Sequence, residues 1–258
     1  NSTSSRTSPI MVHDANVTSF TSGADHSAMV LTDGSLWTFG RNGYGQLGDV
    51  NTTSRLMPVK IEDVNVTQVA AGWNHTLFLK NDGSVWSMGR NNVGQLGDGT
   101  KINRHAPVKI IDENATVVAC GNDHSFVLMN DGSLLAFGHN NNYRIGLSVG
   151  GEYLSPQVVF PDGIASVSSN FEHTLFLKAD GSLWASGLNK FFRVGAGERA
   201  ASVPLTKIVD SGVAGISAGR DHSIYWTTNG DVYVFGSDQL GQLGLGRPVY
   251  VRTPRVLY

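Results

Sequence analysis

The tripeptide Asp-His-Ser contains the residue types of a serine-hydrolase triad and occurs three times, at residues 25–27, 123–125 and 221–223. In a triad the side chains converge in space, whereas adjacent residues of an extended strand point to opposite faces. The histidine also recurs at a fixed spacing, as His26, His75, His124, His173 and His222. Active-site residues seldom repeat in this way. We therefore interpret these histidines as structural and predict a non-enzymatic protein without catalytic residues.

Two other sequence patterns could indicate a metal site or a cofactor site, but they lack the context that such sites need. Five equivalent histidines could ring a channel and bind a metal ion, but fivefold histidine ligation matches no common metal geometry. Residues 43–48, GYGQLG, fit a dinucleotide-binding loop, yet the segment that follows shows no helical periodicity. The sequence therefore predicts no metal and no cofactor.

Composition narrows the class of partner. Of 258 residues only 16% are charged, the net charge is −2, and 31 residues are glycine. Such a weakly charged chain has no strong field for nucleic acid or an anionic membrane surface. No apolar run approaches the roughly 20 residues of a membrane-spanning helix. We expect a turn-rich protein that binds neither nucleic acid nor membranes.

The chain is a tandem repeat. The five histidines are 49 residues apart, and the same step separates two sets of glycines. A period near 50 residues is typical of propeller blades or solenoids. The glycine sets are Gly40, Gly89, Gly138, Gly187 and Gly236, and Gly48, Gly97, Gly146, Gly195 and Gly244.

Each unit carries the pattern of short strands. In the second unit, residues 66–72 end in small residues that suit a crowded inner strand, residues 75–80 form a second strand, and residues 84–89 form a third with alternating apolar positions. Residues 81–83, Asn-Asp-Gly, are typical of a hairpin turn. A fourth strand, residues 107–110, begins with proline, which suits an outer edge strand. Four antiparallel strands without a helix predict one blade of a β-propeller.

Alignment of the units predicts burial of two further residues. Cys120 occupies a position that holds only small residues in the other units, and Trp226 a position that holds only apolar ones. The single cysteine also excludes an internal disulfide and a thiolate cluster. We interpret Cys120 as a small core residue and Trp226 as part of the blade core.

Two stretches, "AAGWNHTLFLKNDGSVWSMGRNNVGQLGDG" (70–99) and "SAGRDHSIYWTTNGDVYVFGSDQLGQLGLG" (217–246), are similar to the repeat of the regulator of chromosome condensation family. The resemblance covers nearly the whole chain. It implies an all-β propeller and a recognition face built on aromatic residues in the turns. The family more often has seven blades.

We expect residues 1–8 to form a disordered tail and residues 9–258 a single propeller domain of five 49-residue blades. Residues 9–12 and 254–258 are both copies of the outer strand. We predict a closed ring sealed where these N- and C-terminal strands meet, with an open arc completed by another chain as the alternative. The units are 9–57, 58–106, 107–155, 156–204 and 205–253, and the closing strand is 254–258.

One position changes in every unit although its neighbours do not. It lies two residues before each histidine, in a turn that should face the channel mouth, and it holds Ala24, Trp73, Asn122, Phe171 and Arg220. Trp and Arg are enriched in protein-binding hot spots. We predict a partner site of Trp73, Phe171, Arg220 and Asn122 with the acidic residues Asp123, Glu172 and Asp221. The alternative is that Trp73 and Phe171 plug a narrow channel.

A second departure lies in the loop after the third strand. Units one, two and five read Gly-Gln-Leu-Gly, whereas units three and four carry Tyr143-Arg144 and Phe192-Arg193. These four residues could form a lateral contact patch, or they could be diverged copies in which the aromatic side chain packs locally.

We therefore predict a monomeric scaffold that presents a loop face to a protein partner. The alternatives are a regulator of a Ran-like small GTPase, which the resemblance implies, and a carbohydrate-binding propeller. In the resembled family, guanine-nucleotide exchange uses a wedge inserted in one blade. No insertion breaks the 49-residue period here, which argues against this activity. Asn-x-Ser/Thr sites slightly favour a secreted or extracytoplasmic location, and they are Asn1, Asn16, Asn51, Asn65, Asn74 and Asn114.

Overall fold

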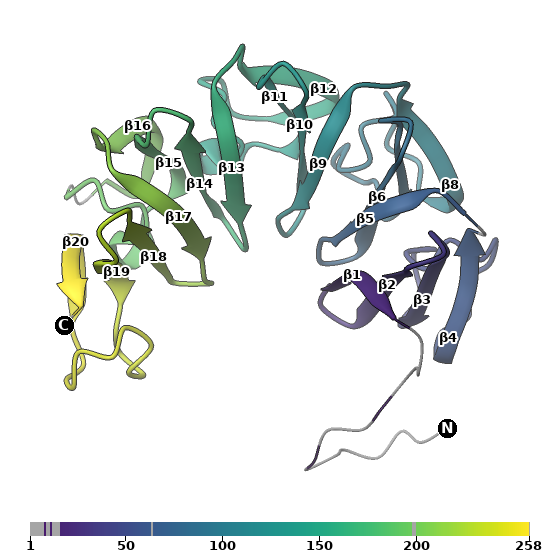
Figure 1. The fold of residues 1–258 in the computed structure, drawn as a ribbon, viewed down its shortest axis with the longest axis horizontal. Coiled ribbons are helices and arrows are strands. Elements are labelled where there is room, and N and C mark those ends of the chain that lie inside the picture. Colours follow the sequence, from purple (N-terminus) through teal and green to yellow (C-terminus); the bar gives the residue numbers. More distant parts are fainter. Residues whose placement is uncertain (1–7, 9–10, 12–15, 63, 198–199, 258) are drawn as a thin grey trace.

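The computed structural model describes residues 8, 11, 16–62, 64–197 and 200–257. Within these residues the chain forms five antiparallel sheets of four strands, each of which is one blade (Figure 1). The elements are β1 (Val17–Ser22), β2 (His26–Leu31), β3 (Leu36–Gly40), β4 (Arg55–Glu62), β5 (Val66–Ala71), β6 (His75–Lys80), β7 (Val85–Gly89), β8 (Arg104–Ile111), β9 (Ala115–Cys120), β10 (His124–Met129), β11 (Leu134–His139), η1 (Asn141–Tyr143), β12 (Glu152–Phe160), β13 (Ile164–Ser169), β14 (His173–Lys178), β15 (Leu183–Leu188), η2 (Lys190–Phe192), β16 (Ser202–Val209), β17 (Val213–Ala218), β18 (His222–Thr227), β19 (Val232–Ser237) and β20 (Tyr250–Leu257).

The predicted hairpin between the second and third strands is confirmed in each blade. In blade 1, the carboxylate of Asp33 accepts hydrogen bonds from the backbone N–H and the hydroxyl of Ser35, at 2.9 and 2.6 Å. Gly34 has φ of +79°, and a Cβ there would lie 2.6 Å from the backbone nitrogen of Asn65. The turn therefore needs glycine both for its left-handed conformation and for the close approach of the next blade.

Neighbouring blades are joined by a repeated hydrogen-bond lock. His26 Nε2 lies 2.9 Å from the hydroxyl of Thr76 in blade 2, and that hydroxyl donates to the carbonyl of Gln46 in blade 1 at 2.9 Å. The same arrangement links His75 to Ser125 at 2.9 Å and His173 to Ser223 at 2.8 Å. The histidine, which is the first residue of the second strand, thus links these blades to the blades that follow them.

The third junction uses a longer path. His124 Nε2 contacts the hydroxyl of Ser169 at 2.7 Å, and Ser169 contacts Thr174, the residue at the usual partner position, at 2.8 Å. Thr174 still donates to the carbonyl of Arg144 in blade 3, at 2.6 Å. One additional hydroxyl therefore extends the lock without breaking it.

The hydrogen-bond network assigns the protonation of these rings. Each partner hydroxyl at the direct junctions gives its single proton to a carbonyl, so it must accept from the histidine, and Nε2 carries the hydrogen. The other ring nitrogen, Nδ1, is buried without a partner in His26, His75, His124 and His173. A second proton would have no acceptor there.

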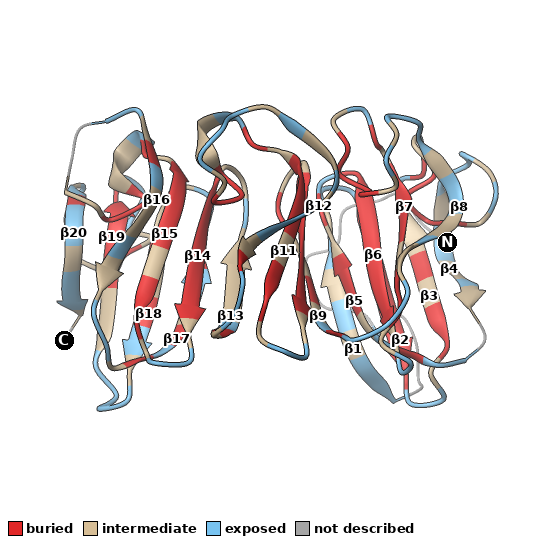
Figure 2. Ribbon diagram, turned by 90° about the horizontal axis from the view of Figure 1, so that it is seen from above, coloured by how far each residue is buried: buried red, intermediate tan, exposed pale blue. Residues whose placement is uncertain are grey.

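Apolar packing fills the space between blades. Val30 and Leu36 of blade 1 and Val66 and Phe78 of blade 2 belong to one buried cluster, and similar clusters follow at the later junctions. A sheet buried on both faces is possible only where it has a neighbour on each side. In Figure 2 the strands β6, β11 and β14 of the interior blades are largely buried, whereas β1 of the end blade is largely exposed.

The two ends of the arc differ from the interior. Val17 and Phe20 on β1 are 44% and 82% exposed, whereas their equivalents Val66 and Val69 are 3% and 4% exposed. Trp226 on β18 is 44% exposed, which makes the prediction that it belongs to the core wrong. Its aligned positions in blades 1 to 4 are covered by the following blade, and blade 5 has no following blade in the described structure.

We expect the same substitution to have different effects in the interior and at the end. Val66→Ala should lower the free energy of unfolding by about 2 kcal/mol, since it removes buried methyl groups and leaves a cavity. Val17→Ala, at the same repeat position, should change it by less than about 0.5 kcal/mol. Urea unfolding of both variants measures the difference, and equal losses would show that β1 is covered in solution.

The structure does not show the predicted closure. β20 pairs with β19 and completes blade 5, so the segment predicted as a closing strand belongs to an ordinary blade. The N-terminal copy at 9–12 and the predicted tail at 1–8 lie outside the described residues apart from Ser8 and Met11. Figure 1 shows the five blades as an arc with blades 1 and 5 at its two ends.

Each blade is a continuous segment that runs from the inner to the outer strand. The sheets therefore cross the boundaries of the sequence units, which start at the outer-strand proline.

Among the described residues, no helix is both long and apolar enough to span a membrane.

Candidate binding face at the channel

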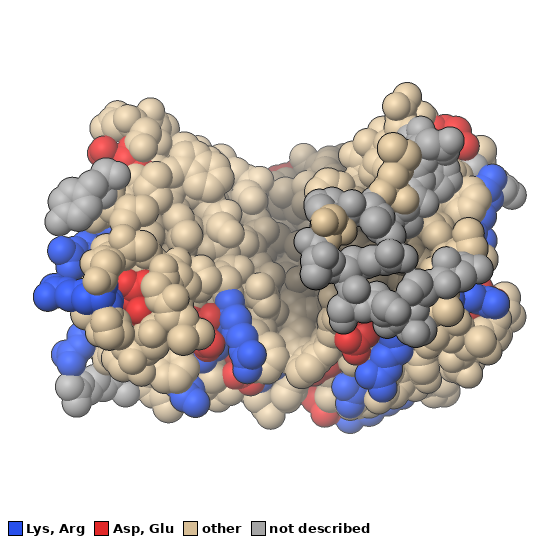
Figure 3. Space-filling model, turned by 90° about the horizontal axis from the view of Figure 1, so that it is seen from below, with Lys and Arg blue, Asp and Glu red and all other residues tan. Residues whose placement is uncertain are grey.

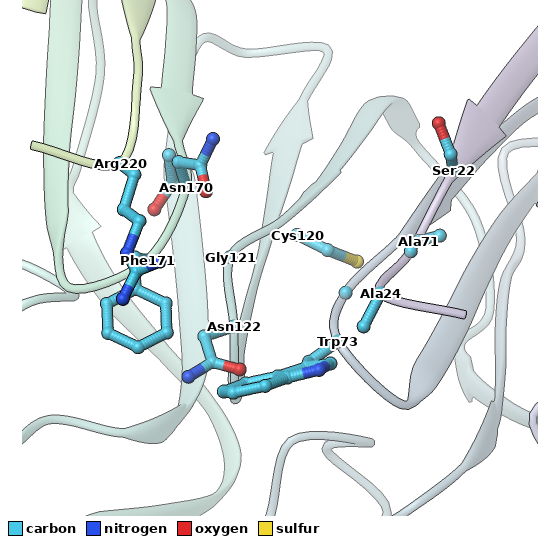
Figure 4. Close-up of a pocket in the computed structure, with 13 residues that line it drawn as sticks. Ser22, Ala24, Ala71, Trp73, Cys120, Gly121, Asn122, Asn170, Phe171 and Arg220 are labelled. Atoms are coloured by element: carbon cyan, nitrogen blue, oxygen red, sulfur yellow. The ribbon is translucent and has the colours of Figure 1, made fainter. Parts of the chain in front are cut away.

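The turns between the first and second strands of the blades surround a central cavity of about 530 Å³. The position that varies between units contributes a side chain from each of the five blades, and Figure 4 shows them around one opening. These residues are Ala24, Trp73, Asn122, Phe171 and Arg220. Four of the seven residues predicted for the partner site are therefore brought together.

The aromatic residues meet across the channel. The rings of Trp73 in blade 2 and Phe171 in blade 4 have centroids 5.7 Å apart and are tilted by 54°. The guanidinium of Arg220 lies 5.2 Å from the Phe171 centroid, a cation–π distance. Trp73 nevertheless stays 42% exposed, and the side chain of Arg220 stays 75% exposed. The cluster narrows the channel and still presents apolar and cationic surface to solvent.

Backbone hydrogen bonds hold the turns in a row. The N–H of Ala24 donates to the carbonyl of Trp73 at 3.3 Å, and that of Trp73 donates to Asn122 at 3.0 Å. The N–H of Asn122 then donates to Asn170 at 2.8 Å. Because these bonds use no side chains, the varying residues can differ in type without loss of the turn.

The wall below the aromatic residues is lined by small side chains. Ser22, Ala71, Cys120 and Ser169 come from equivalent positions at the ends of the inner strands. Burial raises the pKa of the Cys120 thiol to about 12, and its Sγ lies 3.6 Å from the carbonyl of Ala70. The group is a neutral thiol at physiological pH, which does not suit it as a nucleophile.

The three acidic residues predicted for the site have internal partners. Glu172 pairs with Arg144 at 3.3 Å and Asp221 with Arg193 at 3.0 Å. Asp123 lies 3.9 Å from Arg90. These carboxylates lie beside the channel residues in sequence, but they bridge neighbouring blades.

The secondary patch does not form as an exposed surface. Arg144 and Arg193 are only 3% and 2% exposed, so neither guanidinium is available to a lateral partner. Tyr143 and Phe192 are half-buried and have φ of +63°, the conformation that glycine takes in the other units. Sequence reasoning missed the burial because arginine is rarely buried unless it is paired.

The repeated Asp-His-Ser tripeptides do not form triads. His26 contacts Thr76 of the next blade and not the adjacent Ser27. Burial lowers the pKa of His26 to about 4 and that of His75 and His173 to about 3, so these rings are neutral. In the described part of the chain, no group of His, Cys, Asp or Glu side chains has the arrangement of a metal site.

Comparison with known proteins agrees with this geometry. The model of the RCC1-like domain matches residues 1–257. The chain belongs to the family of RCC1-like domains. No curated protein sequence matches it.

Solved structures show the same fold as this RCC1-like domain. Human WBSCR16 superposes with a TM-score of 0.83 at 23% identity, over 95% of this chain and 67% of that protein. Yeast RCC1 (Prp20), bound to Kap60, gives 0.79 at 24% identity, over 91% and 59%. Prp20p from Saccharomyces cerevisiae, described with its binding to Gsp1p and histones, gives 0.79 at 25% identity, over 91% and 61%. The RCC1-like domain thus spans about three fifths of the length of the yeast protein.

Proposed function

We propose that this RCC1-like domain is a non-enzymatic module that binds a protein partner through the channel face. One observation carries the proposal: the single position that varies between units places Trp73, Asn122, Phe171 and Arg220 around one opening. The surrounding scaffold is the same in each unit, so it explains the fold but not these four residues. Exposed Trp and Arg beside a cavity provide the anchors that protein interfaces favour.

The low net charge of the domain favours recognition of a partner through a few aromatic and arginine side chains. With a net charge of −2, long-range attraction contributes little to association. The carbohydrate-binding alternative has less support, because Trp73 and Phe171 form one cluster and do not line two equivalent sugar pockets.

Regulation of a Ran-like small GTPase is the second candidate. Prp20p, which has the same fold, is described with its binding to Gsp1p. The described loops of this chain keep the 49-residue period without an inserted wedge. Release of a fluorescent nucleotide from Ran, measured with and without the domain, tests this candidate directly.

The binding test compares the wild type with the triple variant Trp73→Ala, Phe171→Ala, Arg220→Ala. We expect the partner that the wild type retains from cell extract to be lost by the triple variant. Each removed anchor should weaken binding by roughly 2 kcal/mol, so the combined loss is on the order of 10,000-fold if the three losses add. Pull-down with mass spectrometry, followed by titration of the identified partner, measures both effects.

The structure provides a matched control. Trp226 is exposed to the same degree as Trp73 but lies on the end face of blade 5, so Trp226→Ala should retain the partner. All variants must have the thermal melt of the wild type. If the triple variant also retains the partner, the aromatic cluster only plugs the channel and the proposal fails.

A further inference from the structure

A second hollow lies away from the channel, between η2 of blade 4 and the outer strand of blade 5. Its volume is about 750 Å³, within the usual range for small-molecule sites. We call it the blade 4–5 groove, and its main lining residues are Lys190, Phe191, Phe192, Val249, Tyr250 and Arg252.

Aromatic rings and cations alternate in this groove. Phe191 and Tyr250 stack with centroids 5.4 Å apart and an interplanar angle of 3°. Lys190 Nζ lies 4.9 Å from the Phe191 centroid, and the guanidinium of Arg252 lies 5.0 Å from that of Phe192. Tyr250 remains 45% exposed. The groove thus combines flat apolar surfaces with positive charge at their edges.

The preceding junction shows that the repeat does not require these residues. Forty-nine positions earlier, the counterparts of Lys190, Phe191, Tyr250 and Arg252 are Asn141, Asn142, Ala201 and Val203. Four departures from the repeat, in segments about 60 residues apart, therefore meet at one place. The sequence analysis named Phe192 as a candidate contact residue but did not predict the groove, because its two walls lie far apart in the chain.

The backbone conformation of the loop also supports a functional role for the groove. Phe191 has φ of +67° and Phe192 of +63°. Bulky residues rarely adopt the left-handed region, whereas asparagine, which occupies the equivalent position as Asn142, does so more readily. Phe192 shares its φ of +63° with Tyr143 of the preceding loop, so the strain particular to this loop lies at Phe191. Such strain is commonly found at functional sites.

Several cations around the groove have no carboxylate partner among the residues that the structure describes. Among the described residues, Lys190, Arg247 and Arg252 form no ion pair with a carboxylate. Arg247 and Arg255 line an adjoining hollow along β20, and residues 239–257 contain no Asp or Glu. In Figure 3 Lys and Arg side chains gather along the C-terminal side of the molecule, at the left. This local excess contrasts with the net charge of −2 of the whole chain.

We propose that the blade 4–5 groove binds a small planar anion, an aromatic ring system that carries a carboxylate or a phosphate. The ring packs against Phe191, Phe192 and Tyr250, and the anionic group meets Arg252 and Lys190. The flat aromatic walls of the groove favour a planar ligand, and its positive charge favours a ligand that is negatively charged. This site is independent of the channel face and of any partner bound there.

The test is calorimetric titration of the intact chain with three probes. Naphthalene-2-carboxylate carries a ring and a carboxylate, AMP a ring and a phosphate, and naphthalene-2-methylammonium a ring and a positive charge. We expect at least one of the two anions to bind about tenfold more tightly than the cation, because Lys190 and Arg252 repel a positive charge. Comparison of the two anions shows which group the site prefers.

Variants copied from the preceding junction locate the site. Phe191→Asn with Tyr250→Ala removes the aromatic wall, and Lys190→Asn with Arg252→Val removes the charge. Each pair should weaken anion binding about tenfold. Both should keep the fold, because the chain already tolerates these residues at the same backbone positions in blades 3 and 4. Tyr143→Gly, at the position of Phe192 one blade earlier, is the matched control and should bind as the wild type does.

Three results would overturn the proposal. The first is absence of binding by either anion, and the second is equal binding of the cation. The third is unchanged affinity in both double variants. If only an acidic peptide that contains an aromatic residue bound, the groove would be a peptide-docking surface and the assignment to a small ligand would be wrong.

Discussion

Acidification from pH 7 to pH 5 is expected to destabilise the protein by roughly 6 kcal/mol through His26, His75 and His173, a large part of the stability of a typical domain. The reason is the set of four buried histidines at the blade junctions. Burial lowers the pKa of His26 to about 4, that of His75 and His173 to about 3, and that of His124 well below its ordinary value. In the unfolded chain a histidine titrates near pH 6.5.

The direction follows from proton binding. Below about pH 6.5 the unfolded chain takes up protons on these histidines, while the folded chain does not until its own lower pKa is reached. Stability therefore falls as pH decreases through this window, by roughly 2 kcal/mol for each of His26, His75 and His173 at pH 5, and His124 acts in the same direction. The orphaned Nδ1 atoms give the structural cause, since an added proton would be buried without an acceptor.

Urea unfolding at several pH values between 7 and 5 measures the effect. His75→Gln provides the internal check, because glutamine keeps an N–H donor for Ser125 but does not titrate. The slope of the unfolding free energy against pH should fall by about a quarter in this variant. A free energy that stays constant from pH 7 to pH 5 would contradict the prediction.

Removal of a carboxylate that faces a buried arginine should have the second largest effect. Arg144 has 4% of its side chain exposed and pairs with Glu172, which is 24% exposed. Glu172→Ala would leave the guanidinium buried beside a cavity and without its ion-pair partner, although its Nε would still donate to the carbonyl of Asn141. We expect a loss of about 3 kcal/mol, the lower end of the range for a broken buried ion pair.

The repeat offers a matched control for this change. Asp25 occupies the equivalent position in blade 1 and pairs with Arg41 at 3.2 Å, but both side chains are 55% exposed. Asp25→Ala should therefore cost less than about 1 kcal/mol. Thermal and urea unfolding of the two variants measure the contrast, and similar losses would mean that solvent reaches Arg144.

This result bears on the binding experiment. Glu172 and Asp221 were predicted as polar neighbours of the partner site, yet both stabilise a blade junction. Their substitution would reduce binding through loss of fold even without direct contact to a partner. The test of the channel face therefore uses Trp73, Phe171 and Arg220, whose side chains extend beyond the backbone hydrogen bonds of the turns.

Some features of the site could be predicted because the five units of the repeat can be aligned with one another. Trp73 and Phe171 were recognised since their position varies while its neighbours are constant. The aligned position of Trp226 led to the wrong prediction of burial, because its environment depends on a neighbouring blade and not on its own strand. The burial of Arg144 and Arg193 was missed for the same reason: each carboxylate partner comes from the next blade.

The sequence by itself determined the five four-stranded units and their turns, because alternation of apolar residues and Asp-Gly turns act within a few residues of the chain. Only the tertiary structure decided which side chains meet across blades. Trp73 and Phe171 are 98 residues apart, and Phe191 and Tyr250 are 59 apart. Such contacts depend on how sheets pack face to face and on whether a further sheet covers each end, and no local pattern encodes either.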